Sequence, residues 1–299
     1  MSNKNLNSAK KAKNNEFYTR YEDIEKELRH YDLKGKSIYC NTDDYRKSNF
    51  VKYFVDNFNT LGIDKITATC FDNGDGAYMY QYNGINAIQR KLDGDGDFRS
   101  EECVELLKES DIVITNPPFS LFREFVSQMM EYDKKFLIIG NVNAISYKEI
   151  FPLIKDNKLW AGVSTFNNGM YFGVPNDYKY KDTYKFKREI DGKKVMRVSS
   201  ICWFTNIEHK KRNYPLDLYK KYDAEKYPKY DNYDAIHCER VEDIPCDYYG
   251  IIGVPLTFVG KYCPTQFEIV KFRKGDDNKD LCIKGKKNIY FRILIRSVH

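Results

Sequence analysis

The chain has 299 residues, of which 42% are hydrophobic, and its 49 Lys and Arg exceed its 43 Asp and Glu to give a net charge of +6. This composition is typical of a globular protein with a full core, and no apolar run is long enough to span a bilayer. The polar start of the chain lacks the apolar stretch of a secretory signal, so we expect a cytoplasmic protein without a membrane partner.

The cysteines and histidines give no sign of a metal site. The eight cysteines are scattered without a CxxC pair, and the four histidines lack metal-ligand spacing. We therefore expect no metal, and we expect most of the cysteines to be small buried hydrophobic residues in a reducing compartment.

The first 100 residues begin with a basic segment and continue with alternating elements. Residues 1–15 contain four lysines and no acid, which predicts a flexible basic tail. A helix is expected next, with Tyr21, Ile24 and Leu28 on one face. A strand at residues 37–41, a helix at 48–58 and a strand at 65–71 follow.

The alternation continues through the next 40 residues. We predict a helix at 101–108, a strand at 111–115, a helix at 121–130 and a strand at 135–140. Strands that alternate with helices indicate an α/β fold with a doubly wound, mostly parallel sheet. In such sheets, ligands bind beyond the carboxyl ends of the strands.

After about residue 165 the pattern changes to short strand-like runs, such as 199–205, 250–259 and 289–295. We therefore expect a first domain at residues 16–205, followed by a smaller, less regular recognition region at 206–299. Residues 179–229 contain 15 Lys or Arg against 7 Asp or Glu, with tyrosines interleaved among them. Such a stretch attracts phosphates and exposed bases, although a biased composition and a solvated face would also produce it.

The motif with the most specific chemistry is Asn116-Pro-Pro-Phe119, which follows an apolar strand. The exocyclic amine of a base is a weak nucleophile because its lone pair is delocalised into the ring. The side-chain carbonyl of Asn116 and the main-chain carbonyl of Pro117 can each accept an N–H of such an amine and aim its lone pair at a methyl donor.

The other residues of the motif support this arrangement. Pro117 and Pro118 keep the turn extended and offer no N–H to compete for an acceptor, and Phe119 offers a flat face on which a base can stack. The alternative is a proline-rich turn without a catalytic role.

If the donor is S-adenosylmethionine, acidic residues should follow the earlier strands. Asp72 is placed to accept hydrogen bonds from both ribose hydroxyls, as an acidic residue does in dinucleotide sites. Asp97 could accept the adenine amine, and Phe98 could cover the adenine ring. The methionine part would lie near the polar residues after the first strand, which are Asn41, Asp43 and Asp44. An Asp after a strand is more often a turn or a helix cap, and it is the order of these residues ahead of Asn116 that favours the donor site.

Over nearly its whole length the chain resembles the EcoRI-type adenine-specific DNA methyltransferases. The motifs that carry the resemblance are Asn15-Glu-Phe-Tyr-Thr19, Cys40-Asn-Thr-Asp-Asp44, Gly94-Asp-Gly-Asp-Phe-Arg99, Thr115-Asn-Pro-Pro-Phe-Ser-Leu-Phe-Arg123, Cys202-Trp-Phe-Thr205, Gly253-Val-Pro-Leu-Thr257 and Tyr290-Phe-Arg-Ile-Leu-Ile295.

The resemblance implies a methyltransferase fold, S-adenosylmethionine as donor and a flipped adenine in double-stranded DNA as acceptor. It also implies that residues 16–205 form the methyltransferase catalytic domain, that 206–299 form a target-recognition region, and that Phe17 and Thr19 close over the donor. Asn41-Thr-Asp-Asp44 stands in place of the glycine-rich loop of other methyltransferases, a departure that the family shares. We expect a monomer that acts with a cognate restriction endonuclease or alone.

Three other functions remain open at this point. The same chemistry could serve cytosine N4, a guanine amine in ribosomal RNA, or a protein glutamine. The appended basic region and the full-length resemblance favour adenine in DNA, and a DNA-binding module without catalysis would not need an intact Asn-Pro-Pro-Phe motif.

Overall fold

The computed structural model describes residues 18–72, 74, 76–174, 187–190, 192–287 and 290–298. The chain is divided into two units, one made of residues 1–144 and 162–207 and the other of 145–161 and 208–299. Residues 145–161 thus belong to the second unit, although the sequence places them in the catalytic domain. The predicted basic tail at 1–15 lies outside the described residues.

The first unit contains an eight-stranded sheet with the order β5-β4-β3-β2-β6-β7-β12-β8. Its strands in chain order are β2 (Ser37–Cys40), β3 (Lys65–Thr69), β4 (Tyr78–Tyr82), β5 (Ala87–Lys91), β6 (Ile112–Thr115), β7 (Lys135–Asn141), β8 (Trp160–Phe166) and β12 (Ile201–Thr205). Parallel pairing joins β3, β2, β6 and β7, whereas β4, β5 and β12 run antiparallel to their neighbours. The expected mostly parallel sheet is therefore a mixed sheet with a parallel centre.

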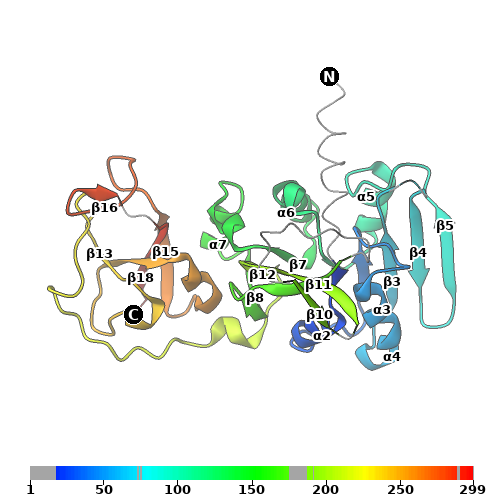
Figure 1. Ribbon diagram of the computed structural model, residues 1–299, viewed down its shortest axis with the longest axis horizontal. Helices are drawn as coiled ribbons and strands as arrows, with labels where there is room; N and C mark the ends of the chain where they lie inside the picture. Colours follow the sequence, from blue (N-terminus) through cyan, green and yellow to red (C-terminus); the bar gives the residue numbers. More distant parts are fainter. Residues whose placement is uncertain are drawn as a thin grey trace, which may run out of the picture. The chain divides into compact units, whose positions relative to one another are not determined.

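Helices cover both faces of this sheet. Those of the first unit are α2 (Tyr21–Leu28), α3 (Asn49–Asp56), α4 (Phe58–Leu61), α5 (Glu101–Lys108) and α6 (Phe122–Glu131). In Figure 1, α5 and α6 lie on one face, and α2, α3 and α4 lie on the other. Side-chain caps mark the starts of α3 and α5. At α3 the Ser48 hydroxyl accepts from the amides of Phe50 and Val51 at 3.1 and 3.4 Å. Ser100 caps α5 through the amide of Cys103 in the same way.

The core on the α2 and α3 face is apolar and closely packed. Trp203 is fully buried, and its ring meets that of Phe50 edge to face at 6.0 Å between centroids. Trp203 and Phe204 are thus core residues. Six of the eight cysteines are also buried, as expected, whereas Cys246 is exposed and Cys282 is half-buried.

Glu27 fixes α2 to β8 inside this core. Its buried carboxylate accepts from the Tyr31 hydroxyl at 2.7 Å and from the main-chain amides of Val163 and Ser164 at 2.7 and 2.6 Å. A buried charge with three donors is well satisfied, so this contact holds the helix against the sheet.

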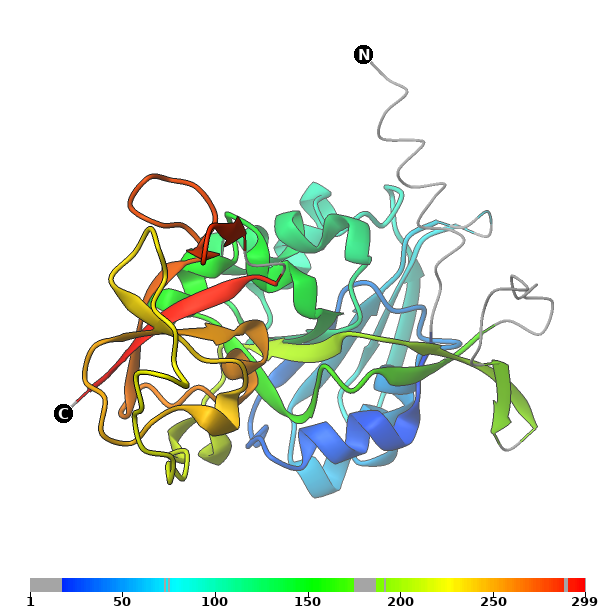
Figure 2. The same cartoon turned by 60° about the vertical axis from the view of Figure 1, so that its left-hand side comes forward.

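Two features of the first unit were not predicted. One is the β4–β5 hairpin, although Asn83-Gly84 is a typical hairpin turn and Asn83 Oδ1 accepts from the amide of Asn86 at 2.8 Å. The other is a small sheet of order β1-β9-β11-β10, formed by β1 (Tyr18–Thr19), β9 (Met170–Gly173), β10 (Lys187–Ile190) and β11 (Lys193–Val198). In Figure 2, the hairpin of β10 and β11 extends away from the eight-stranded sheet.

The second unit is more regular than the sequence suggests. It has a four-stranded sheet of order β13-β14-β18-β15 and a two-stranded β16-β17 ribbon. Its elements are α7 (Phe151–Lys155), β13 (Ala235–His237), β14 (Ile251–Pro255), β15 (Phe267–Phe272), β16 (Cys282–Ile283), β17 (Lys286–Lys287) and β18 (Arg292–Ser297). The strand-like run at 250–259 ends early because residues 256–261 form a 3-10 turn.

Candidate active site

The Asn116-Pro-Pro-Phe119 loop begins where the buried strand β6 ends. Asp111 anchors the start of this strand, since its carboxylate accepts from the amide and the hydroxyl of Ser37 at 2.8 and 2.9 Å. Asn116 and Phe119 are half-buried, and the Phe119 ring packs against the edge of the core. The loop therefore has a fixed base and a partly open aromatic face.

The loop after β2 lies beside the Asn116-Pro-Pro-Phe119 loop. After β2 the chain adds β3 on one side of this strand, and later it adds β6 on the other side. The order in which strands are added therefore reverses between β2 and β6, which makes this position a topological switch point. Ligands bind at such switch points in open α/β sheets. Contact between the two loops is direct, because the hydroxyls of Thr42 and Thr115 lie 2.6 Å apart and that of Thr42 is 3.4 Å from the main-chain oxygen of Asn116.

The carboxylates of Asp43 and Asp44 are held by the protein itself. Asp43 accepts from the hydroxyls of Ser48, at 2.6 Å, and of Thr115. Burial raises the pKa of the Asp43 carboxyl to about 6, although these hydrogen bonds oppose the shift. Arg46 donates twice to Asp44 through its side chain, at 2.8 and 2.9 Å, and lowers the pKa of Asp44 against the effect of partial burial.

The residues expected to bind the adenosine part lie on two loops that touch. The amide of Asp72 donates to the main-chain oxygen of Asp95 at 2.8 Å, which joins the loop after β3 to the loop before α5. Within the first loop, Asp72 Oδ1 accepts from the amides of Gly74 and Gly76 at 2.6 and 2.9 Å. The two loops thus bring Asp72 close to the Asp95–Asp97 turn.

Asp97 and Phe98 are ordered by their neighbours. Arg99 donates to both carboxylate oxygens of Asp97, at 2.9 and 2.6 Å, and lowers the Asp97 pKa although partial burial acts to raise it. Phe98 is only 4% exposed and packs against Phe125, with ring centroids 5.1 Å apart. Phe98 is thus mostly a core residue, with little surface to offer a ligand.

Gly96 lets these two loops approach, and its substitution should damage the site. Its φ is +72°, and a Cβ there would lie 2.1 Å from the main-chain oxygen of Cys70. We expect Gly96→Ala to lower the free energy of unfolding by about 2–4 kcal/mol and to weaken binding of S-adenosylmethionine. Thermal unfolding and calorimetric titration with the donor would measure both effects.

The control for this prediction is two residues away. A Cβ at Gly94 would meet no described atom within 4 Å, and its φ lies outside the left-handed region. Gly94→Ala should therefore leave both quantities nearly unchanged. Equal behaviour of the two variants would contradict the importance of the loop contact.

Asn41 and Thr19 carry buried polar atoms that the described residues do not satisfy. Asn41 is 1% exposed and Thr19 is 3% exposed, and neither the amide atoms of Asn41 nor the hydroxyl of Thr19 has a hydrogen-bond partner in the described ranges. Such an atom costs about 1–3 kcal/mol unless a ligand satisfies it. Both residues adjoin the start of α3, since Asn49 Nδ2 donates to the Thr19 main-chain oxygen at 2.7 Å and Asn41 begins the loop that leads into this helix.

These unsatisfied atoms fit a donor with a polar amino-acid end. Among the expected cofactor residues, the structure therefore brings Asn41, Asp43 and Asp44 to one loop, and Asp72 and Asp97 to two adjoining loops. Phe17 lies outside the described residues. The contact between the hydroxyls of Thr42 and Thr115 was not predicted. The sequence signal for it was a hydroxyl residue directly before Asn116.

The arrangement defines a class of enzyme. A switch point lined with polar groups for a donor, beside an Asn-Pro-Pro-Phe loop that can hold an amine, is the site of an S-adenosylmethionine-dependent methyltransferase that acts on nitrogen.

Comparison with known proteins specifies this class. The sequence model described as adenine-specific methyltransferase EcoRI matches residues 5–297. The type II methyltransferase M.EcoRI of Escherichia coli is 48% identical, with 99% of this chain and 97% of that protein aligned. The chain belongs to the adenine-specific methyltransferase EcoRI family, and it is an enzyme that takes its methyl group from S-adenosylmethionine.

Two further relatives come from mycoplasmas. The type II methyltransferases M.MpnI of Mycoplasma pneumoniae and M.MgeORF184P of Mycoplasma genitalium are each 42% identical over 89% of this chain, and the alignments cover 84% and 85% of those proteins. No solved structure matches the chain significantly.

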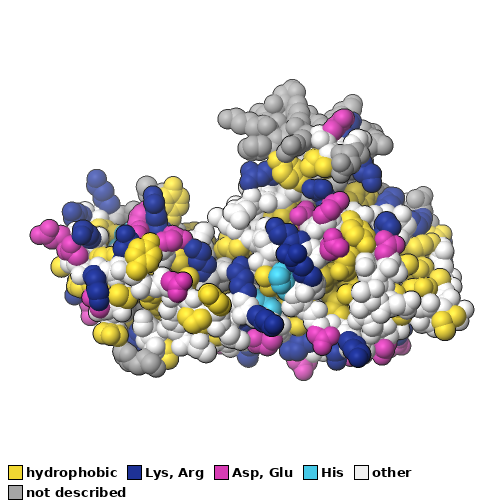
Figure 3. All heavy atoms as spheres, turned by 90° about the horizontal axis from the view of Figure 1, so that it is seen from below, with side chains coloured by type: hydrophobic (Ala, Val, Ile, Leu, Met, Phe, Trp, Pro, Cys, Tyr) yellow, Lys and Arg dark blue, Asp and Glu magenta, His cyan; other side chains and the backbone are white. Residues whose placement is uncertain are grey.

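Three lysines of the basic segment that lie in the second unit are ion-paired. Lys221, Lys226 and Lys229 face Asp247, Asp223 and Asp234 at 3.7, 3.2 and 3.5 Å. Tyr214 and Tyr219 are exposed. On the face of the molecule in Figure 3, Lys and Arg side chains are interspersed with Asp and Glu.

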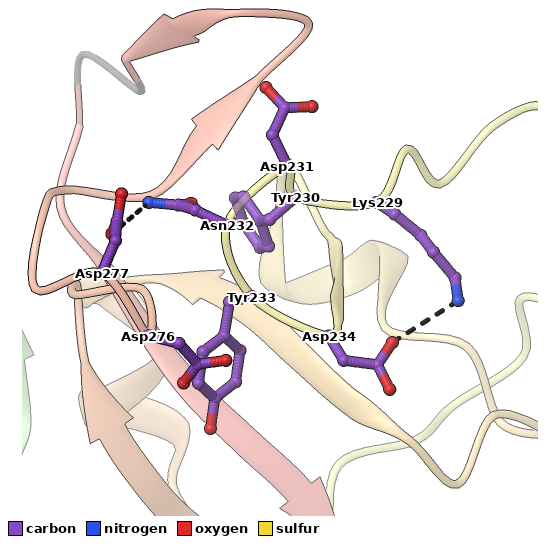
Figure 4. A pocket seen from close by; sticks show the side chains of 8 residues that line it. All are labelled: Lys229, Tyr230, Asp231, Asn232, Tyr233, Asp234, Asp276 and Asp277. Atoms are coloured by element: carbon purple, nitrogen blue, oxygen red, sulfur yellow. Dashed lines mark hydrogen bonds and ion pairs between the residues drawn. The ribbon is translucent and has the colours of Figure 1, made fainter.

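A pocket in the second unit is acidic. Four of its eight lining residues are Asp, and the Asn232 amide donates to Asp277 at 2.9 Å across it (Figure 4). Its charge would repel a DNA phosphate. In the ranges that the structure describes, no helix is long and apolar enough to cross a membrane, and no group of three or more His, Cys, Asp or Glu could hold a metal ion.

Proposed function

We propose that this enzyme transfers a methyl group from S-adenosylmethionine to the N6 amine of a flipped adenine at a defined sequence in double-stranded DNA. The observation that carries the proposal is the direct contact of the Asn116 loop with the loop after β2 at the switch point of the sheet. The names of the relatives, all type II methyltransferases, support a DNA substrate.

The catalytic loop would orient the acceptor. The Asn116 side-chain oxygen and the Pro117 main-chain oxygen would each accept an N–H of the adenine amine, with Pro118 holding the turn and Phe119 stacking on the base. Because the amine of a stacked base is out of reach, the nucleotide must swing out of the duplex at a cost of about a few kcal/mol. A methylated amine loses its extra proton readily, so these carbonyls suffice without a strong base.

The donor loops would hold S-adenosylmethionine, which when bound supplies a methyl group made electrophilic by its sulfonium. The Asp72 carboxylate would accept hydrogen bonds from the ribose hydroxyls, and that of Asp97 would accept one from the adenine amine beside Phe98. Asn41 and Thr19 would hydrogen-bond the methionine end of the donor. The carboxylates of Asp43 and Asp44 already have protein donors, so we assign them to the shape of this loop.

The remaining assignments concern context. We infer that the parallel centre of the sheet is Rossmann-like, as in other methyltransferases, and that the second unit reads the target sequence. The exposed tyrosines and exposed lysines of residues 210–229 would contact the DNA backbone. A monomer in the cytoplasm suits one transfer per site, with a cognate restriction endonuclease as the expected partner in the cell.

The test is expression in cells that lack adenine methylation, followed by single-molecule sequencing of their DNA. We expect N6-methyladenine at one short sequence throughout the genome. N4-methylcytosine in its place would change the acceptor, and an unmodified genome would refute the DNA substrate and direct attention to RNA or protein.

A further inference from the structure

We propose that Asp43 is a positioning residue that, through Thr115, holds the catalytic loop against the donor-binding loop. The inference rests on the proposed function and adds a residue that acts on Asn116 without touching either substrate. It differs from the expectation drawn from the sequence, in which Asp43 contacts the methionine end of the donor.

The contacts form one chain of hydroxyls and a carboxylate, here called the clasp, made of Thr42, Asp43, Ser48 and Thr115. Asp43 lies on the loop after β2, and its two carboxylate oxygens are taken by two different elements. Oδ1 accepts from Ser48, which also caps α3, and Oδ2 accepts from Thr115, the last residue of β6. The amide of Asp43 donates to the main-chain oxygen of Thr69 at 3.0 Å, which ties the same residue to the end of β3.

The direction of the hydroxyl protons follows from the chemistry of the groups. An ionised carboxylate only accepts, so Thr115 and Ser48 must donate to Asp43. The single proton of Thr115 is then used, and the contact between the two threonine hydroxyls at 2.6 Å requires Thr42 to donate to Thr115. Hydrogen bonds to an ionised acceptor are about twice as strong as neutral ones, so Asp43 fixes the orientation of the whole clasp.

The clasp ends at the residue that orients the acceptor. Thr115 directly precedes Asn116, and the Thr42 hydroxyl lies 3.4 Å from the Asn116 main-chain oxygen, so its single proton is shared between this oxygen and the Thr115 hydroxyl. A small displacement of Asn116 would misalign the amine with the methyl group, and a misplacement of about 1 Å can cost about 100-fold in rate. Strands β2, β3 and β6 are thus locked together at the point where donor and acceptor meet.

Variants of the threonines separate this role from contact with the donor. Thr115→Val removes the hydroxyl without changing the shape of the side chain, and Thr42→Val removes the half-buried end of the clasp with less risk to folding. Thr205→Val is the matched control, because Thr205 is also fully buried in this sheet and donates to the main-chain oxygen of Phe136 at 2.7 Å. Asp43→Asn keeps a hydrogen-bonding group of the same shape, and the hydroxyls can reverse to meet it.

Two quantities are measured for each full-length variant. Calorimetry gives the affinity for S-adenosylmethionine, and a single-turnover assay gives the rate of methyl transfer to DNA. We expect Thr115→Val and Thr42→Val to lower the rate at least about tenfold while the donor affinity changes less than about threefold. The single-turnover rate of Asp43→Asn should lie between the rates of these variants and that of the parent enzyme. Thr205→Val should transfer at the parental rate even if its stability drops equally.

Parental rates in both threonine variants would overturn the proposal, as would a tenfold or greater loss of donor affinity in Asp43→Asn with an unchanged rate. A failure of the proposed function is distinguishable, since the parent enzyme itself would then methylate no adenine in DNA.

Discussion

Asn116→Ala is expected to reduce methyl transfer by at least about 10²–10³-fold, the usual cost of removing one side chain that stabilises a reacting group. Alanine leaves only the Pro117 main-chain oxygen to hold the amine, so the lone pair of the base is no longer aimed at the donor. Since Asn116 is half-buried at the end of a well-anchored strand, the fold should survive. Single-turnover methylation of a DNA duplex that carries the mapped site would measure the loss.

The same variant should still bind DNA and S-adenosylmethionine within about threefold of the parent. The Asn116 side chain acts mainly in the transfer step, and other residues make most of the contacts with DNA and the donor. Asn116→Asp retains one carbonyl-type acceptor and should keep part of the activity. Asn86→Ala, in the exposed turn between β4 and β5, is the matched control and should be fully active. Full activity of Asn116→Ala would remove the mechanism while leaving the family assignment intact.

The elements around the site were predicted best, because they show strong periodicity and clear caps. The helix at 101–108 was predicted with its observed bounds, helped by Ser100 and by two acidic residues in the first turn. Strand β6 and the loop after it followed from three apolar residues and two prolines. Local chemistry decides such elements, so a single sequence suffices to find them.

The parts that were missed depend on contacts between distant residues. Nothing near Asp43 in the sequence indicates that Thr115 will donate to it, because the two residues are 72 positions apart. Phe98 is a different case, since an aromatic residue beside an acid predicts a ligand contact, and the fold also packs this ring against Phe125. Tertiary packing therefore determines which polar residues face a ligand and which hold the site together.

The place of residues 145–161 in the second unit was also not predicted. Residues 145–161 follow a regular α/β alternation, yet α7 packs on β15 of the second unit, where Phe151 and Phe272 meet at 4.8 Å. The chain leaves the first unit after residue 144 and returns to it at Gly162, and no change in residue composition marks this segment. A segment that leaves a domain and returns is recognised only from its contacts.

Asn41→Leu is expected to abolish measurable donor binding while leaving the unliganded protein as stable as the parent or more stable. In the part of the chain that the structure describes, both amide atoms of Asn41 are buried without a partner, so removing them relieves an unmet desolvation cost of about 1–3 kcal/mol. A residue that is unfavourable for folding and favourable for the ligand is typical of a binding site. Chemical unfolding and the thermal shift on adding S-adenosylmethionine would measure the two effects.

Asn206→Leu makes the opposite case and so provides the control. Asn206 is also buried, but its side chain accepts from the Phe136 amide at 2.8 Å and donates to the Lys134 main-chain oxygen at 2.9 Å. Its loss leaves two main-chain groups unpaired, which should lower the free energy of unfolding by about 2–4 kcal/mol without affecting donor affinity. If Asn41→Leu instead lost stability as Asn206→Leu does and still bound the donor, Asn41 would be a structural residue and the methionine end would have to lie elsewhere.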